Sequence, residues 1–203
     1  KYPVAERDHS KLLIYNKGII SQEQFSSIPS FIPEGSMMVF NNTKVVPARL
    51  FFKKDTGALI EIFCLEPVTP SDYSVSFACI SECSWKTIIG NVKKWKGGYL
   101  SFFVPEGADS DVAGLNLKAE LIEKQDNSYI VRFFWEGGHP FSKVLELCGQ
   151  VPIPPYLNRE TEAVDLERYQ TLYAKFRGSV AAPTAGLHFT EDVLGKIRAK
   201  GVD

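Results

Sequence analysis

The sequence has no long apolar run and almost no net charge. No hydrophobic stretch among its 203 residues approaches the roughly 18 residues expected of a membrane span. The 23 Lys and Arg residues nearly balance the 24 Asp and Glu residues, which gives a net charge of −1 at pH 7. Bulk charge therefore indicates neither a membrane nor a nucleic acid as partner, and RNA binding would need a local basic patch. We expect a cytoplasmic monomer without membrane association.

The sequence also lacks the cysteine spacing of metal and redox sites. Its four cysteines, Cys64, Cys79, Cys83 and Cys148, include no C-x-x-C pair, and a thiolate zinc site needs more ligands close by. We therefore expect reduced, structural thiols and no metal. The hydrophobic content of 44% is enough for a sizeable core in one large domain or two small ones.

Neither end of the sequence has the pattern of a natural terminus. It opens at Lys1 without an initiator Met, and no signal-peptide pattern follows. It stops just after Gly201, where a helix is expected to end and a strand to begin. We expect the protein to continue at both ends.

Three zones differ in their hydrophobic pattern. In residues 1–52, the apolar runs Leu12–Tyr15 and Met37–Phe40 are separated by proline and glycine, which predicts short buried strands. Residues 53–138 contain six strand-length runs between turn residues, in which polar and apolar positions often alternate. The six runs are Leu59–Leu65, Tyr73–Ser81, Trp85–Ile89, Tyr99–Val104, Leu115–Ile122 and Tyr129–Trp135. Because the turns between these runs leave no room for helices, the six runs predict a small antiparallel six-stranded β-barrel.

The third zone, residues 139–203, has helical spacing. A short helix is expected to start at Pro140 and end at Gly149. A second helix, capped by Asp165, is expected to carry apolar residues as far as Phe176, and Thr190 is expected to cap a third. Since strand and helix patterns flank the β-only zone, we predict that the barrel is inserted into an α/β domain formed by residues 1–52 and 139–203.

Three segments contain residue types that carry chemistry. Arg7, Asp8 and Ser10 come directly before an apolar run, and this group could equally be a solvated loop that caps the strand. Asn41, Asn42, Thr43, Lys44 and Arg49 follow another apolar run, where α/β folds place ligands, although a plain Asn-rich turn explains them as well.

The third segment contains Pro183, Thr184, Ala185, Gly186, His188 and Phe189. Small residues beside a fixed proline would let a ligand approach the backbone closely. His188 is either a structural core residue or the proton carrier of a site, because imidazole titrates near neutral pH.

The barrel zone contributes a fourth group, the cations Lys53, Lys54, Lys93, Lys94 and Lys96 with the aromatic Trp95. Cations beside an aromatic residue can lie along an RNA backbone and stack on a base, and a solvated hairpin face is the competing interpretation.

Several long motifs, in order, resemble those of the S-adenosylmethionine:tRNA ribosyltransferase-isomerases. The resemblance is close in both outer zones and weak in the barrel zone. The motifs are Arg7-Asp8-x-Ser10, the run from Asn41 to Leu50, Pro152-x-Pro154-Pro155-Tyr156, Tyr169-Gln170-Thr171-x-Tyr173, and the run from Ala181 to Phe189.

The resemblance implies a barrel inserted into a catalytic α/β domain that continues beyond this chain. It implies transfer and isomerisation of the ribosyl group of S-adenosylmethionine onto 7-aminomethyl-7-deazaguanine in tRNA, with release of adenine and methionine and no metal. Asp8 and His188 become the candidates for the proton steps. Arg7, Lys44 and Arg49 are candidate anion contacts, and Ser10, Asn41, Asn42, Thr43 and residues 183–186 with Phe189 are candidate nucleoside contacts. The alternatives are a non-catalytic tRNA-binding module and a relative with a changed substrate.

Overall fold

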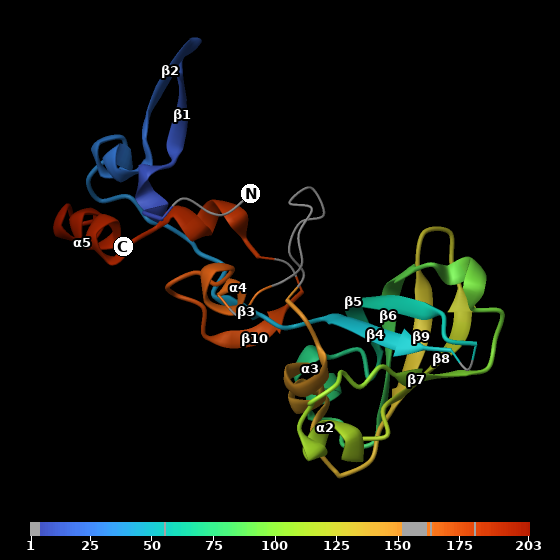
Figure 1. The fold of residues 1–203 in the computed structure, drawn as a ribbon. Coiled ribbons are helices and arrows are strands. Elements are labelled where there is room, and N and C mark those ends of the chain that lie inside the picture. Colours follow the sequence, from blue (N-terminus) through green and yellow to red (C-terminus); the bar gives the residue numbers. More distant parts are fainter. Residues whose placement is uncertain (1–4, 55, 152–161, 163, 181) are drawn as a thin grey trace. The chain divides into compact units, whose positions relative to one another are not determined.

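The computed structural model describes residues 5–54, 56–151, 162, 164–180 and 182–203. These residues fall into two compact units (Figure 1). The barrel unit is Val46–Pro152, and the outer unit combines Lys1–Val45 with Ile153–Asp203. Each unit has its own core, so we describe them one at a time.

The barrel unit contains a closed, antiparallel barrel of six strands, as predicted. Around the barrel the strands follow the order β4-β5-β6-β9-β8-β7. Their bounds are β4 Arg49–Lys53, β5 Leu59–Thr69, β6 Glu82–Gly90, β7 Tyr99–Phe102, β8 Lys118–Lys124 and β9 Tyr129–Phe134. Closure leaves no free sheet edge in this unit.

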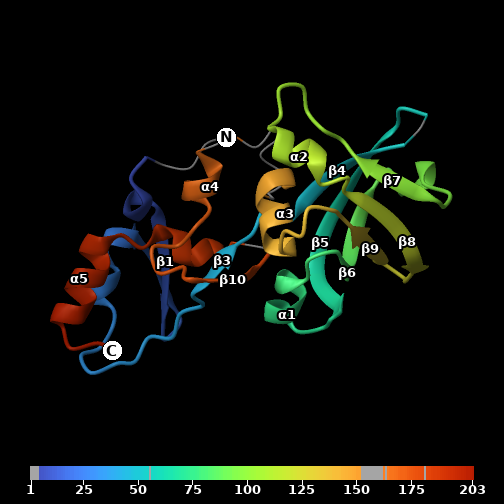
Figure 2. The same cartoon turned by 90° about the horizontal axis from the view of Figure 1, so that it is seen from below.

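Aromatic side chains fill the inside of the barrel. Trp85, Phe52 and Phe133 are completely buried there. Phe141, at the start of helix α3 (Phe141–Cys148), lies 5.6 Å from Trp85 and 5.5 Å from Phe133 between ring centroids. Figure 2 shows α3 at one end of the barrel, which this helix therefore closes with an aromatic plug.

One of the six strands differs from the predicted set. Residues Tyr73–Ala78 form helix α1, and Asp72 caps it by accepting a hydrogen bond from the Val75 N–H at 3.0 Å. Tyr73 and Phe77 therefore share a helix face, four residues apart, and both pack on Trp85. The prediction of a strand at Tyr73–Ser81 is wrong, and β4 takes its place in the barrel.

Helices are not excluded from the predicted barrel zone. Besides α1 it contains α2 (Ser110–Gly114), and a short 3-10 helix, η3, covers Val92–Lys94. The expected limits of 53–138 also leave out α3 and all of β4 except Lys53, although the structure places both elements in the barrel unit. The helix from Pro140 to Gly149 is confirmed as α3, with these two residues as its caps.

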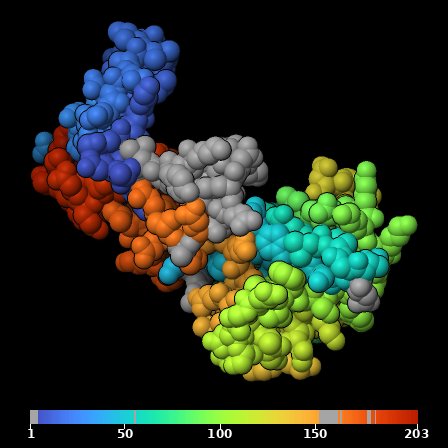
Figure 3. Space-filling view, in the orientation of Figure 1, coloured from blue at the N-terminus to red at the C-terminus, as the bar shows by residue number. Residues whose placement is uncertain are grey.

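In the outer unit, a two-stranded antiparallel hairpin precedes a small core. Strand β1 (Lys11–Asn16) pairs with β2 (Ile19–Gln24), and the hairpin projects from the unit in Figures 1 and 3. The 3-10 helices η1 (Arg7–His9) and η2 (Phe25–Ser30) flank it. The run Leu12–Tyr15 is thus a strand but not a buried one, since Leu13 and Tyr15 are each 71% exposed.

The remaining elements of the outer unit include one parallel strand pair, β3 (Thr43–Val45) with β10 (Phe176–Ser179). The helical elements are α4 (Asp165–Arg168), η5 (Thr184–His188) and α5 (Glu191–Ala199). The core of the unit contains Phe25, Phe189, Val193, Leu194, Ile197 and Val202. This mixture does not establish the α/β class predicted for the outer domain.

Two more expectations for the outer unit are wrong. Met37–Phe40 is not a strand, although Met38 and Phe40 pack on the core, and the N–H of Met38 donates to the carbonyl of Asp203 at 2.6 Å. The helix expected from Asp165 to Phe176 ends at Arg168, and Val164 rather than Asp165 is its N-cap. Leu166 and Leu172 are exposed, so this segment has no continuous apolar helix face.

The helix expected after Thr190 is confirmed as α5. The Thr190 side chain caps it, and Val193, Leu194 and Ile197 are buried. None of the helices in the described ranges is long and apolar enough to cross a bilayer.

Candidate active site

Two predicted segments that are far apart in the sequence meet in the outer unit. Helix η1 carries Arg7 and Asp8, and η5 ends at His188. His188 Nδ1 lies 3.3 Å from the Arg7 carbonyl oxygen, and the Thr190 hydroxyl donates to Asp8 Oδ2 at 3.0 Å. The structure therefore brings together the two segments that contain the residues predicted to carry protons.

The partner of His188 determines its tautomer. A carbonyl oxygen only accepts hydrogen bonds, so a neutral imidazole in this contact carries its proton on Nδ1. Nε2 then has the free lone pair of a base. The ring also packs on Phe25, with 5.4 Å between centroids, and is partly exposed. A neutral His188 in this contact would therefore have Nε2 as its unprotonated ring nitrogen.

Asp8 is held by the start of helix α5. As the helix cap, the Thr190 hydroxyl accepts a hydrogen bond from the N–H of Val193 at 3.3 Å. The same hydroxyl donates a hydrogen bond to the Asp8 carboxylate. One hydroxyl group thus satisfies the helix end and positions the carboxylate.

Arg7 is engaged with backbone. Its guanidinium donates to three carbonyls at the end of α4, those of Glu167, Arg168 and Gln170, at 2.9–3.2 Å. Burial, and secondly the nearby charge of Arg168, lower the pKa of Arg7. These bonds favour a positioning role over an anion contact. Ser10 also helps to position Arg7, because the Ser10 hydroxyl donates at 2.9 Å to the Arg7 carbonyl that His188 contacts.

The polar run after Phe40 lies along the β3–β10 pair. Asn41 Oδ1 accepts from both the N–H and the hydroxyl of Thr43, and the Asn42 carbonyl accepts the Lys175 N–H at 2.7 Å. The side chains of Asn41, Asn42 and Lys44 are exposed, so they are available to a ligand.

Sequence reasoning missed Gln170 as a site residue. Its side-chain amide accepts the Val45 N–H at 2.9 Å and donates to the Val45 carbonyl at 2.8 Å, while its backbone carbonyl binds Arg7. Gln170 therefore connects the polar run to η1. Its place in the Tyr169-Gln170-Thr171 motif was the available indication.

Arg49 belongs to the barrel unit, whereas Arg7, Asp8, Lys44 and His188 belong to the outer unit. Its Nε lies 2.9 Å from Glu61 Oε1, and its backbone pairs with Gln150. This ion pair offsets part of the charge that Arg49 would offer to a ligand phosphate.

The small residues of the third segment have different environments. Thr184 and Ala185 are exposed, Pro183 is partly exposed, and Phe189 belongs to the core of the outer unit. Gly186 is buried, and a Cβ there would collide with the Tyr173 hydroxyl. Tight packing is thus one sufficient reason for glycine at this position. The predicted motif residues Pro152–Tyr156 lie outside the described residues.

The lysine-rich group of the barrel unit is not a stacking platform. Trp95 is buried, and its Nε1–H donates to the Gly98 carbonyl at 3.1 Å. The indole therefore cannot receive a base, and it fixes its own loop instead. Lys53, Lys93, Lys94 and Lys96 are exposed, and Lys54 is partly exposed. In the described ranges, no group of three or more His, Cys, Asp or Glu residues is placed to hold a metal ion.

Two curated relatives of this chain have the same name. A relative from Trichlorobacter lovleyi, named S-adenosylmethionine:tRNA ribosyltransferase-isomerase, is 38% identical over 100% of this chain and 53% of its own length. A relative of the same name from Aquifex aeolicus is 35% identical over 100% and 54%. The crystal structure of an S-adenosylmethionine tRNA ribosyltransferase from Thermotoga maritima is 24% identical over 99% of this chain and 50% of its own, with a TM-score of 0.33.

The chain spans about half the length of the curated relatives that it matches. The family model described as queuosine biosynthesis protein matches residues 1–203. This chain therefore belongs to the queuosine biosynthesis protein family.

Proposed function

We propose that the chain is the part of an S-adenosylmethionine:tRNA ribosyltransferase-isomerase that contains its proton-transfer residues. The reaction would move the ribosyl group of S-adenosylmethionine onto the aminomethyl group of 7-aminomethyl-7-deazaguanine in tRNA. Isomerisation of the ribosyl group would give epoxyqueuosine, with adenine and methionine as the other products. The observation that carries this proposal is that η1, η5 and the start of α5 contact one another, through His188 with the Arg7 carbonyl and Thr190 with Asp8.

The chemistry of the sulfonium explains why a base is needed. The positive sulfur acidifies the adjacent 5′ carbon, so a positioned base can remove a proton there, and a proton donor can assist the departure of adenine. His188 Nε2 is our candidate for this base, because Nδ1 is used on the Arg7 carbonyl.

Asp8 has a second role in the proposal. One of its oxygens is bound by Thr190, and the other can face the sulfonium or deliver a proton to the leaving adenine. The exposed groups of Asn41, Asn42, Thr43 and Lys44, with Ser10, Thr184 and Ala185 from the neighbouring segments, are proposed nucleoside contacts. Pro183, Gly186 and Phe189 would shape the surface beneath them. Arg49 belongs to the barrel unit and is proposed only as a separate anion contact.

The test is release of adenine. Full-length protein would be incubated with labelled S-adenosylmethionine and tRNA that carries the aminomethyl base, and free adenine would be measured over time. Adenine release that requires the modified tRNA supports the proposal. Binding of tRNA without any binding of S-adenosylmethionine by calorimetry would favour a non-catalytic tRNA-binding module. Turnover with a different base would indicate a relative with a changed substrate.

A further inference from the structure

The outer face of the barrel carries a row of polar side chains across three strands. In the registers of β4 with β7 and of β7 with β8, Lys53 lies opposite Ser101, and Ser101 lies opposite Lys118. All three side chains are exposed. Since adjacent strands are about 4.8 Å apart, the two lysines flank the hydroxyl over roughly 10 Å.

More lysines lie at the strand ends beside this row. Lys54 Nζ donates to the Lys94 carbonyl at 3.3 Å, which joins the β4–β5 turn to the loop after β6. The buried Trp95 anchors that loop, so its lysines are held outward. We call the set Lys53, Lys54, Lys93, Lys94, Lys96 and Lys118 the lysine strip.

The charges of the lysine strip are not neutralised within the described residues. No carboxylate of the described chain forms an ion pair with any of its six lysines, whereas Lys86 pairs with Glu66 and Arg132 with Glu120 at 2.6–2.8 Å. Lys53 instead lies 5.8 Å from the centre of the Phe103 ring. Unpaired cations at fixed spacing are suited to bind a chain of phosphates.

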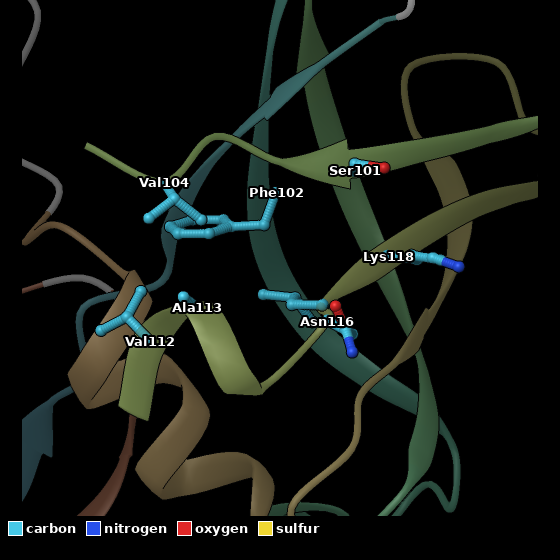
Figure 4. A pocket seen from close by; sticks show the side chains of 8 residues that line it. Ser101, Phe102, Val104, Val112, Ala113, Asn116 and Lys118 are labelled. Carbon is cyan, nitrogen blue, oxygen red and sulfur yellow. The ribbon is translucent and has the colours of Figure 1, made fainter. Parts of the chain in front are cut away.

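A hollow of about 100 Å³ opens beside the row (Figure 4). Phe102 and Val104 form one side, and Val112 and Ala113 from helix α2 form the other, as Figure 4 shows. Ser101, Asn116 and Lys118 supply its polar atoms, and the buried Leu117 completes the lining. An aromatic wall with a few polar groups at the rim is typical of sites for an unstacked base.

Acidic groups limit where an anion can lie. Asp109 and Asp111 are at the start of α2, and Glu136 accepts the Asn116 amide at 2.7 Å. These carboxylates repel phosphate from the α2 side of the hollow. A bound nucleotide would therefore have its phosphates over Lys53 and Lys118 and its base in the hollow.

We propose that the lysine strip and the hollow bind an unpaired segment of the RNA substrate, with one base inserted between Phe102 and Ala113. The inference rests on the proposed function, because it specifies how the barrel would hold tRNA. It places the RNA on a face distinct in sequence from Asp8 and His188, so the two proposals fail separately.

The test compares binding of a labelled single-stranded oligouridylate and of an RNA duplex of equal length by fluorescence anisotropy at several salt concentrations. The double substitution Lys53→Gln with Lys118→Gln should reduce the slope of log K against log salt by about 1.4, or about 0.7 for each lost phosphate contact. Ala113→Leu, which fills the hollow from an exposed position, should weaken single-strand binding by about tenfold with an unchanged slope. Lys143→Gln, on α3, is the matched control and should change neither quantity.

A second measurement does not depend on these variants. Photo-crosslinking with 4-thiouridine in the oligonucleotide should label peptides within residues 101–118. Full affinity in Ala113→Leu, tighter binding of duplex than of single strand, crosslinks confined to other peptides, or no RNA binding at all would each overturn the inference. Adenine release is measured separately on full-length protein with saturating modified tRNA, so a failure of oligonucleotide binding alone overturns this inference and not the proposed function.

Discussion

The barrel unit and the outer unit stabilise their structures in different ways. In the barrel unit, every strand is hydrogen-bonded to two neighbours in a closed sheet. Aromatic side chains fill the interior, and Phe141 covers one end. Among its described residues, the outer unit has two separate strand pairs, a core cluster that includes six buried side chains, and an exposed apolar hairpin. Its candidate catalytic groups are held by hydrogen bonds among short helices rather than by a sheet. The unit with the closed sheet and the unit with the candidate catalytic residues are therefore different units.

The strongest test of this comparison is removal of the barrel plug. Phe141→Ala should lower the free energy of unfolding of the barrel by about 3–5 kcal/mol, because it leaves a large cavity against Trp85 and Phe133. The three tryptophans, Trp85, Trp95 and Trp135, all lie in the barrel unit, so their fluorescence during denaturation reports this unit alone.

Phe141→Leu serves as the control, since it keeps most of the buried volume and should lose much less stability. A small loss for both variants would show that α3 is not needed to close the barrel.

The second test addresses the chemistry of the outer unit. His188→Gln should lower turnover of the full-length enzyme by about a hundredfold or more with little change in affinity for S-adenosylmethionine, because glutamine cannot act as a base. The assay is adenine release under single-turnover conditions, with barrel fluorescence as the check on folding.

His9→Gln is the matched control. His9 is also in the outer unit, but its side chain is 52% exposed and its Nε2 lies 2.7 Å from a Glu6 oxygen, so turnover should not change. Equal turnover in His188→Gln and His9→Gln would mean that His188 is structural.

The third test uses alkaline pH to separate the units. All four cysteines lie in the barrel unit, and burial raises the pKa of Cys64, Cys83 and Cys148, that of Cys148 to about 12. Unfolded thiols ionise near pH 8.5, whereas these folded thiols stay protonated, so unfolding releases protons above that pH. Barrel stability should therefore be complete below about pH 8.5 and should fall as pH rises towards the folded values.

The measurement is the denaturation midpoint from tryptophan fluorescence between pH 7.5 and 10. Cys64→Val should make the decline shallower, since one of the raised thiols is then absent. A midpoint that does not change over this range would contradict the burial of the thiols.

The smallest expected effect concerns the hairpin of the outer unit. Leu13→Ser should change the free energy of unfolding by no more than about 0.5 kcal/mol, because the side chain is 71% exposed. Urea denaturation followed by circular dichroism would measure this, and Val193→Ala on the buried face of α5 is the contrasting variant. A loss of several kcal/mol for Leu13→Ser would show that the hairpin is covered in solution.

The barrel was predictable from sequence because strand patterns and turns are local. The error at Tyr73–Ala78 has a physical cause: residues spaced by two and by four lie on one face in a strand, and the pair Tyr73 and Phe77 also shares a helix face. The cap that Asp72 provides favours the helix over the strand. Met37–Phe40 failed for another reason, since an apolar run becomes a strand only if a partner strand is available.

The candidate site was predictable only as separate segments. Resemblance to a family selected Asp8 and His188, but no local pattern says that Thr190 reaches Asp8 or that Arg7 presents its carbonyl to His188. Those contacts depend on how η1, η5 and α5 pack. Gln170 was not predicted, because its side-chain amide bonds the backbone N–H and carbonyl of Val45 as a neighbouring strand would. No sequence pattern marks a glutamine that does this.

The double use of the Thr190 hydroxyl links two kinds of motion. Whenever the first turn of α5 frays, the cap bond to Val193 opens, and the hydroxyl that restrains Asp8 is released with it. Amide exchange at Val193 and rotation of the Asp8 carboxylate should therefore have a common opening rate. A ligand that fixes Asp8 would, by the same connection, slow the fraying of a helix that it never touches.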